Sequence, residues 1–251
     1  MSTGPMARAW QAGWWALRFL TRLPLPRRAA PDADVQARSV LFYPLVGLVI
    51  GALLAALGAV LASADAGVGA ALLLTVWVGI TGALHLDGVA DTADAWLGSH
   101  GDRQRALEIM KDPRSGAAGV TAVGLILILK FAALGALLAE HAWLALWFAP
   151  LLGRAAIVLM LLRLPYLRPD GLGALLAARL PRPAAWWVLF AVGAGVVVFG
   201  YAGSSLLLAA VLIAGTFIVW LRRWLGGCTG DTLGAGCELV ETAVLIAAVL
   251  A

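Results

Sequence analysis

The sequence predicts an all-α membrane protein: a polytopic bundle of about six to seven transmembrane helices, preceded by a helix that lies in the membrane interface. Of the 251 residues, 62% are hydrophobic and only 13% are charged, and the apolar residues gather in long runs. A water-soluble domain carries about 25% charged residues. Half of that share leaves too little polar surface for water, so we expect one integral-membrane domain over 1–251.

The chain begins with an amphipathic segment. Residues 8–20 place Trp10, Trp14 and Leu17 at helical spacing, which is typical of a helix lying in the interface of a bilayer. Pro24 and Pro26 end this helix.

The transmembrane segments follow. A crossing needs about 20 apolar residues, and six segments meet that need, at about 39–62, 68–86, 118–139, 141–162, 184–200 and 204–220. The last segment, about 232–251, is apolar only from Leu239. It is either a seventh span or a half-buried helix.

Basic residues orient these spans. Lys and Arg fall in the segments 21–38, 87–117, 163–183 and 221–231, whereas the connections at 63–67, 140–142 and 200–205 hold none. Cytoplasmic loops carry the excess of Lys and Arg. We therefore expect a cell (inner) membrane protein whose N-terminus and large polar segments are cytoplasmic. This topology accounts for the net charge of +4, and no motif for nucleic-acid binding is present.

Three aspartates follow the second predicted span. If the helix continues, Asp87, Asp91 and Asp94 lie at i, i+4 and i+7 and form one stripe. Like charges on one face repel, and hard divalent cations such as Mg²⁺ bind carboxylate oxygens. We predict that these three residues are catalytic and bind metal. The alternative is a solvated acidic helix end, and His85, roughly opposite Asp87, is weak evidence for a further ligand or base.

The next polar segment combines a basic loop with a glycine-rich helix start. A helix from about 102 should end before the proline that follows Asp112, because the residue before a proline is pushed toward an extended conformation. A helix N-terminus with a nearby guanidinium suits a phosphate group. The predicted substrate-binding residues here are Lys111, Asp112, Arg114, Ser115 and Gly116. The alternative is a basic loop that only sets topology.

A third group of charges lies in or beside the later spans. A glycine turn delivers Asp231, and Glu238 shares its face if the region is helical. Arg154 lies about 12 Å from the cytoplasmic end of its helix at 1.5 Å per residue, so it can reach the acids or a phosphate. We predict that these three bind substrate, although Asp231 is alternatively a helix N-cap. Lys130 is expected to snorkel or to pair with Glu140.

These motifs together resemble the cobalamin synthase family, adenosylcobinamide-GDP ribazoletransferase. The core is Asp87-Gly88-x-Ala90-Asp91-x-x-Asp94 followed by Lys111-Asp112-x-Arg114-x-Gly116. The matching elements cover almost the full length, at 19–24, 42–47, 84–96, 109–119, 153–154 and 227–241. The core is also similar to that of CDP-alcohol phosphotransferases, but those usually carry Ala-Arg after the Asp-Gly, and here Asp91 follows Ala90.

The resemblance implies a Mg²⁺-dependent transfer. A ribose hydroxyl of α-ribazole, or of its 5′-phosphate, attacks the phosphorus attached to cobinamide in adenosylcobinamide-GDP, and GMP leaves. In that reading the three aspartates hold Mg²⁺, and Arg114, with Lys111 or Arg154, neutralises phosphate oxygens. Either Asp87 or Asp94 accepts the hydroxyl proton.

Other classes of function remain open at this point. Membrane carboxylates with Lys130 and Arg154 also fit a cation- or proton-coupled transporter, although the acids lie at the cytoplasmic end and transporter sites cluster at the midplane. A CDP-alcohol phosphotransferase of lipid synthesis is the second alternative. A structural scaffold does not explain the aligned acids. The many small residues allow such a bundle to form a homo-oligomer.

Overall fold

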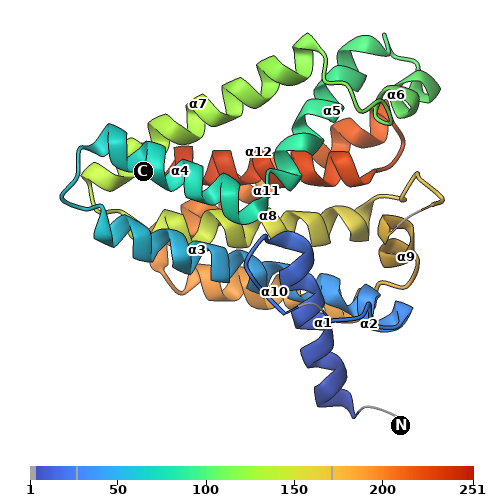
Figure 1. Cartoon of the computed structure of the whole chain (residues 1–251), viewed down its shortest axis with the longest axis horizontal. Coiled ribbons are helices and arrows are strands. Elements are labelled where there is room, and N and C mark those ends of the chain that lie inside the picture. The colour runs from blue at the N-terminus through green and yellow to red at the C-terminus, as the bar shows by residue number, and fades with distance from the viewer. Residues whose placement is uncertain (1–3, 27, 171) are drawn as a thin grey trace.

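The computed structural model describes residues 4–26, 28–170 and 172–251. Arg27, one of the basic residues of the segment 21–38, lies outside these ranges. The helices (Figure 1) are α1 (Pro5–Leu20), α2 (Ala33–Arg38), the 3-10 helix η1 (Ser39–Phe42), α3 (Tyr43–Val60), α4 (Ala66–Thr81), α5 (Leu84–Gly98), α6 (Arg103–Ile109), α7 (Ala117–Ala139), α8 (Trp143–Arg163), α9 (Leu172–Ala178), α10 (Arg182–Val197), α11 (Gly200–Trp224) and α12 (Gly230–Leu250).

The predicted all-α membrane fold is confirmed. Five helical segments are long and apolar enough to cross a membrane, and a sixth is added if α4 and α5 count as one broken span. The final segment, left open by the sequence, is among the five as α12. The span expected at 184–200 is the shorter α10, a helix of 16 residues. At 1.5 Å per residue α10 is about 24 Å long, less than the roughly 30 Å hydrocarbon core.

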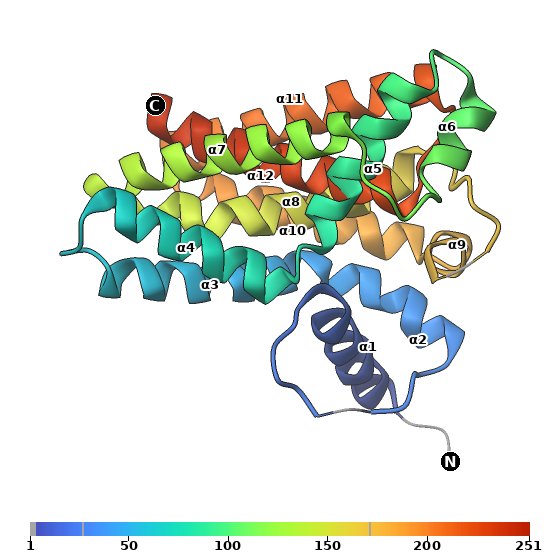
Figure 2. The same cartoon turned by 45° about the horizontal axis from the view of Figure 1, so that its top comes forward.

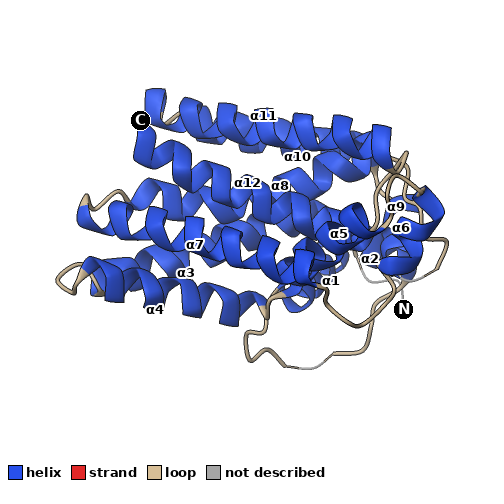
Figure 3. Cartoon of the chain, turned by 90° about the horizontal axis from the view of Figure 1, so that it is seen from above, coloured by secondary structure: helices blue, strands red, loops and turns tan. Residues whose placement is uncertain are grey.

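The long helices run side by side and the short ones gather at one end. α12 packs against α5, α7, α8 and α11, while α3 packs on α8 and α4 on α7. Viewed from above, α5, α6, α9 and α2 lie at the same end of the bundle (Figure 3). The segments predicted to be cytoplasmic therefore meet at that end, because α5, α6 and α9 belong to them.

The predicted second span differs most from expectation. The chain bends by 88° between α4 and α5. Gly82 and Ala83 have left-handed φ values of 62° and 56°, which ends one helix and starts another, and Gly82 is suited to this conformation because it lacks a Cβ. The Arg22 backbone N–H donates to the Ile80 carbonyl, 2.6 Å away, at the end of α4. The aspartates therefore belong to a separate helix, not to an extension of the span.

The N-terminal helix lies outside the bundle (Figure 2). α1 packs against α2, η1 and α3. It buries Ala12, Ala16 and Leu20, while Trp10 remains 61% exposed. A helix with one face on the protein and an exposed tryptophan is compatible with the predicted interfacial position.

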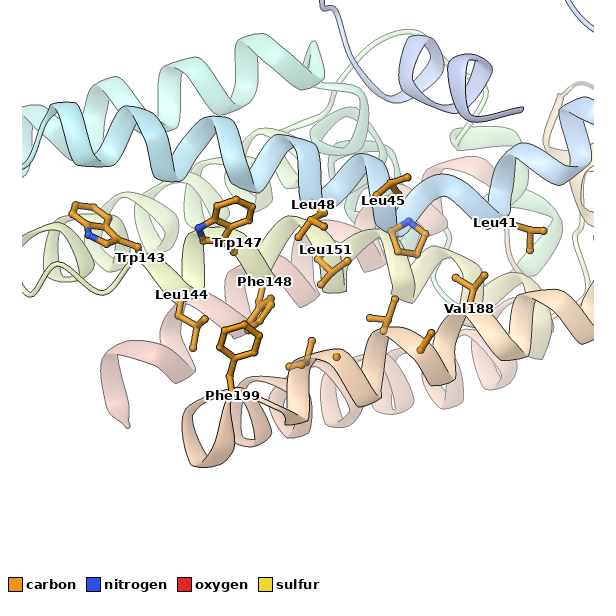
Figure 4. Close-up of a pocket in the computed structure, with 15 residues that line it drawn as sticks. Leu41, Leu45, Leu48, Trp143, Leu144, Trp147, Phe148, Leu151, Val188 and Phe199 are labelled. Carbon is orange, nitrogen blue, oxygen red and sulfur yellow. The ribbon is translucent and has the colours of Figure 1, made fainter. Parts of the chain in front are cut away.

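A large groove between α3, α8 and α10 carries no charge. Its volume is about 800 Å³, and its walls include Leu48, Trp147, Leu151 and Val188 (Figure 4). Since its lining residues are all apolar or aromatic side chains and glycine, it offers nothing for phosphate chemistry. The candidate site lies elsewhere.

Candidate active site

The three predicted aspartates lie on α5, which leaves the bend with Asp87 in its first turn. Asp87 is exposed, and Asp91 and Asp94 are half-buried. Their spacing on one helix confirms the expected stripe. An anionic side chain in a first turn is favoured by the partial positive charge of the helix N-terminus, so the bend itself stabilises the Asp87 carboxylate.

Asp94 makes contacts that the sequence did not reveal. Its Oδ2 accepts the N–H of Gly116 at 2.6 Å, and its Oδ1 accepts the N–H of Gly119 at 2.8 Å. These are the free amides at the start of α7. The helix N-terminus predicted to bind a substrate phosphate thus binds a carboxylate of the protein, which anchors α5 to α7.

The basic loop before α7 points into solvent. Arg114 forms a bidentate pair with Asp112, with Nε–Oδ1 and Nη2–Oδ2 distances of 3.0 and 2.7 Å. These hydrogen bonds lower the pKa of Asp112 to about 2. The Arg114 side chain is 86% exposed, and Lys111 and Ser115 are exposed as well. The expected helix end is confirmed, since α6 ends at Ile109.

Asp231 joins the site from α12. The N-cap of that helix is Thr229, which forms a capping box with Thr232, so the N-cap alternative for Asp231 is wrong. Instead, Asp231 pairs with Arg168, whose Nη2 lies 2.6 Å from the Asp231 Oδ2. The same guanidinium nitrogen donates to the Met110 carbonyl at 3.0 Å.

Arg168 is the site residue that the sequence missed. It comes from the loop after α8, which is pinned to the turn before α12: Leu167 donates to the Cys228 carbonyl, and Cys228 donates to the Pro165 carbonyl, both at 2.9 Å. In the sequence, Arg168 is one of many basic residues in a cytoplasmic segment. No local signal separates it from them, because its role depends on a contact 63 residues away.

α5 and α12 meet closely at Gly88. A Cβ at this position would collide with the backbone of Asp231, so glycine allows the two helices to approach. The charges that act on Asp91 are accordingly those of Asp231, Asp87, Arg168 and Asp94. The site therefore combines the predicted Asp87 and Asp91 with Asp231, and Arg168 is the cation that pairs with Asp231 and acts on Asp91.

Two other predicted substrate ligands lie in the interior. Lys130 pairs with Glu238 at 2.6 Å and with Glu241, and Arg154 pairs with Glu241. All four side chains are at most 5% exposed. The geometry thus keeps Glu238 and Arg154 away from the acids on α5.

The expected pairing of Lys130 with Glu140 is wrong. Ten helical residues separate them by about 15 Å, and Glu140 is exposed at the end of α7. Lys130 instead faces the interior, with Nζ 4.3 Å from the centroid of the Trp77 ring. His85 connects this interior network to the site: it is buried, and its Nδ1 lies 3.4 Å from Nη2 of Arg154.

A small cavity opens beside the acids. It has a volume of about 200 Å³, and both Asp87 and Asp231 line it, together with His85 and Tyr166. Carboxylates beside a cavity can bind a cation, hold a hydroxyl group and accept its proton. This arrangement suits transfer of a phosphate-linked group.

Comparisons with known proteins agree with these features. The model of the family described as Cobalamin-5-phosphate synthase matches residues 12–249. The chain belongs to this family.

Three similar relatives are all named adenosylcobinamide-GDP ribazoletransferase. An adenosylcobinamide-GDP ribazoletransferase of Pseudomonas fluorescens is 51% identical over 242 residues, covering 94% of this chain and 98% of the relative. One from Stutzerimonas stutzeri is 53% identical over 234 residues, covering 92% and 94%. One from Pseudomonas entomophila is 51% identical, covering 93% and 96%. No solved structure matches the chain.

For this member of the Cobalamin-5-phosphate synthase family, the resemblance implies Mg²⁺. The donors at the site fit: Asp87, Asp91 and Asp231 supply carboxylate oxygens, the ligands that Mg²⁺ prefers. Within the described ranges, no three His, Cys, Asp or Glu side chains lie close enough to enclose a metal. Mg²⁺ usually takes one or two carboxylates, with phosphate and water completing its shell. Metal binding by Asp87, Asp91 and Asp94 together stays a prediction.

Proposed function

We propose that this chain is an adenosylcobinamide-GDP ribazoletransferase that uses Mg²⁺. It joins α-ribazole, or its 5′-phosphate, to the cobinamide phosphate and releases GMP. The observation that carries this proposal is the group formed by Asp87, Asp91 and Asp231 beside Arg168, at the end of a membrane bundle of this family. The family match favours this reaction over a transporter and over a CDP-alcohol phosphotransferase.

Arg168 is the candidate residue for binding the pyrophosphate. Arg168 is held by Asp231 and Met110, and its buried Nε has no hydrogen-bond partner among the described residues. The Arg168 side chain is 25% exposed beside the acids, so its guanidinium is suited to donate to an oxygen of the pyrophosphate. Bound Mg²⁺ would neutralise the charge that develops on the leaving GMP.

Asp87 is the proposed acceptor of the hydroxyl proton. The acceptor hydroxyl forms a new O–P bond, the P–O bond to GMP breaks, and the hydroxyl proton moves to a carboxylate. Both oxygens of Asp94 already accept backbone N–H groups. Asp87 is exposed and lines the cavity, so it is the better placed of the two candidates.

We also propose that the chain lies in the cell (inner) membrane with its N-terminus and acids in the cytoplasm. The cations gathered at the α5–α6–α9 end support this orientation. In Glu108→Cys and Glu140→Cys variants, which lie at opposite ends of the bundle, a membrane-impermeant thiol reagent applied to spheroplasts should label only position 140. Labelling of position 108 in sealed spheroplasts would contradict the orientation.

The reaction is tested by GMP release from purified protein supplied with adenosylcobinamide-GDP, α-ribazole and Mg²⁺. Asp87→Asn should lower the rate at least about 100-fold, the lower range for a lost general base. The melting temperature should change little, because losing the favourable contact with the helix N-terminus is offset by losing the repulsion from Asp91 and Asp231. Glu108→Gln, an exposed carboxylate on α6, is the matched control and should keep full activity. No GMP release from folded wild-type protein in several lipids would overturn the proposal.

A further inference from the structure

The 200 Å³ cavity beside the acids is lined by two chemically different kinds of residue, acidic or polar and aliphatic. Six elements converge on it: α1, α3, α5, α8, α9 and the start of α12. Its polar lining residues include Asp87, Asp231 and His85. The aliphatic part of the lining is formed largely by Leu20, Ile157, Leu161, Leu176 and Leu233, each at most 8% exposed.

Aromatic rings complete the wall. Phe19 and Tyr43 stack with centroids 6.3 Å apart, and Tyr166 packs over Gly173 of α9. Flat aromatic ligands gain from offset or edge contacts with such rings. The cavity therefore suits a flat, largely apolar group with one polar end.

Size limits which part of the substrates can enter. Pockets for whole drug-sized ligands measure roughly 300–1,000 Å³, so 200 Å³ accommodates a fragment. A corrin macrocycle is far larger than this fragment. One bicyclic base fits, with its sugar at the mouth.

The two bases in the substrates, guanine and dimethylbenzimidazole, differ in polarity. Guanine has donors and acceptors along most of its edge. Even with Asp87, Asp231 and His85 in the lining, the part of that edge that lies against Leu161 and Leu176 has no partner, which is unfavourable. The dimethylbenzimidazole base of α-ribazole has two methyl groups and a single free ring nitrogen. It matches an aliphatic wall, and its ribose would then lie beside Asp87 and Asp231, where the attacking hydroxyl is needed.

We propose that this cavity is the acceptor pocket, in which Leu161 and Leu176 select α-ribazole by enclosing its apolar base. The inference rests on the proposed function, and it adds specificity-determining residues to that function. The apolar groove between α3, α8 and α10 has no carboxylate, so it cannot orient a hydroxyl for transfer.

The experiment compares two enlarged pockets with a matched control. Leu161→Ala and Leu176→Ala remove wall atoms from α8 and α9, respectively. Leu162→Ala removes an equally buried side chain, 4% exposed against 3% for Leu161, that does not line the cavity. Initial rates of GMP release are measured with α-ribazole, with the riboside of unmethylated benzimidazole and with that of the larger naphthimidazole, at saturating adenosylcobinamide-GDP. KM for adenosylcobinamide-GDP is measured separately, by varying its concentration at saturating α-ribazole.

Both pocket variants should raise KM for α-ribazole about 10-fold, the loss typical of methylene-sized contacts. They should also shift preference toward the naphthimidazole riboside, while KM for adenosylcobinamide-GDP stays within about 2-fold of wild type, a margin well below that contact loss. Leu162→Ala should leave the order of preference unchanged. A merely structural role predicts lower activity without a change in base preference.

The outcomes separate the two proposals. Absence of GMP release by wild-type protein would overturn the proposed function. Normal wild-type release, with base preference unchanged in both pocket variants or with KM raised for adenosylcobinamide-GDP instead, would overturn only the acceptor pocket. If one variant does not fold, the other still decides, because they alter different helices.

Discussion

The two acidic regions along α12 differ in how their charges are compensated. At its start, Asp231 joins Asp87 and Asp91 on a partly exposed surface, where Arg168 pairs with Asp231 and acts on Asp91. Two turns later, buried Glu238 and Glu241 face the two buried cations Lys130 and Arg154. The first region has two more negative than positive charges among these residues, whereas the second is balanced.

This difference separates a functional site from a structural one. A buried ion without a partner is strongly destabilising, so the interior region can persist only if its charges balance. The surface region tolerates an excess because water and a bound cation can offset it. Imbalance, rather than the number of acids, marks the candidate active site.

The largest effect on stability is expected from removing one charge of the buried interior network. Glu241→Gln would leave Lys130 and Arg154 with a single carboxylate, and breaking a buried pair costs about 3–5 kcal/mol. The melting temperature in detergent should fall by several degrees. Glu140→Gln, at the exposed end of α7, should not change it. An unaltered melting temperature for Glu241→Gln would mean that the interior network contributes little to stability.

A smaller and purely functional effect is expected at the surface. Asp91→Asn should raise the Mg²⁺ concentration needed for half-maximal GMP release by about 10- to 100-fold, or about 1.4–2.7 kcal/mol. It should not lower the melting temperature, because it removes repulsion from Asp231 and Asp87. Full turnover at low Mg²⁺ would show that Asp91 holds no shared metal.

Asp94 should behave as a structural acid within the functional stripe. The amide in Asp94→Asn keeps one acceptor oxygen and loses the charge at the start of α7, which should destabilise the protein by about 1 kcal/mol. The amide hydrogens of Gly116 and Gly119 should exchange faster with solvent. If instead Mg²⁺ dependence changes as strongly as in Asp91→Asn, Asp94 belongs to the metal site.

The smallest effect is expected for the exposed Asp112–Arg114 pair. The folded-state pKa of Asp112 is about 2, below its ordinary value of 3.8, so any stabilisation is present above pH 3.8 and lost as pH falls toward 2. Arg114→Gln should thus have a slightly lower melting temperature than wild type at neutral pH and the same melting temperature near pH 2. A large loss of GMP release in this variant would restore Arg114 as a substrate ligand.

The sequence predicts the helices and the acidic stripe because both depend on local spacing. Apolar runs predict most spans, and the i, i+4, i+7 pattern places Asp87, Asp91 and Asp94 on one face. Partners across the bundle cannot be predicted in this way. The pairing of Lys130 with Glu238 spans 108 residues, and it depends on which faces of α7 and α12 meet.

The bend was missed for a related reason. Gly82 is one of 29 glycines, and no proline marks the break after Thr81. Ala83 adopts a left-handed conformation that few alanines adopt. Only tertiary contacts, such as the hydrogen bond from Arg22 to Ile80, favour ending the helix there.

Because of the bend, the orientation of the acids on α5 does not depend on the length of α4. In one continuous helix, a residue inserted into α4 would rotate every later side chain by about 100° and turn Asp87 away from Asp231. With two left-handed residues between the helices, the rotation of α5 is set by its contact with α12 at Gly88. The membrane-crossing part can therefore lengthen or shorten to match a bilayer while the carboxylates keep their positions.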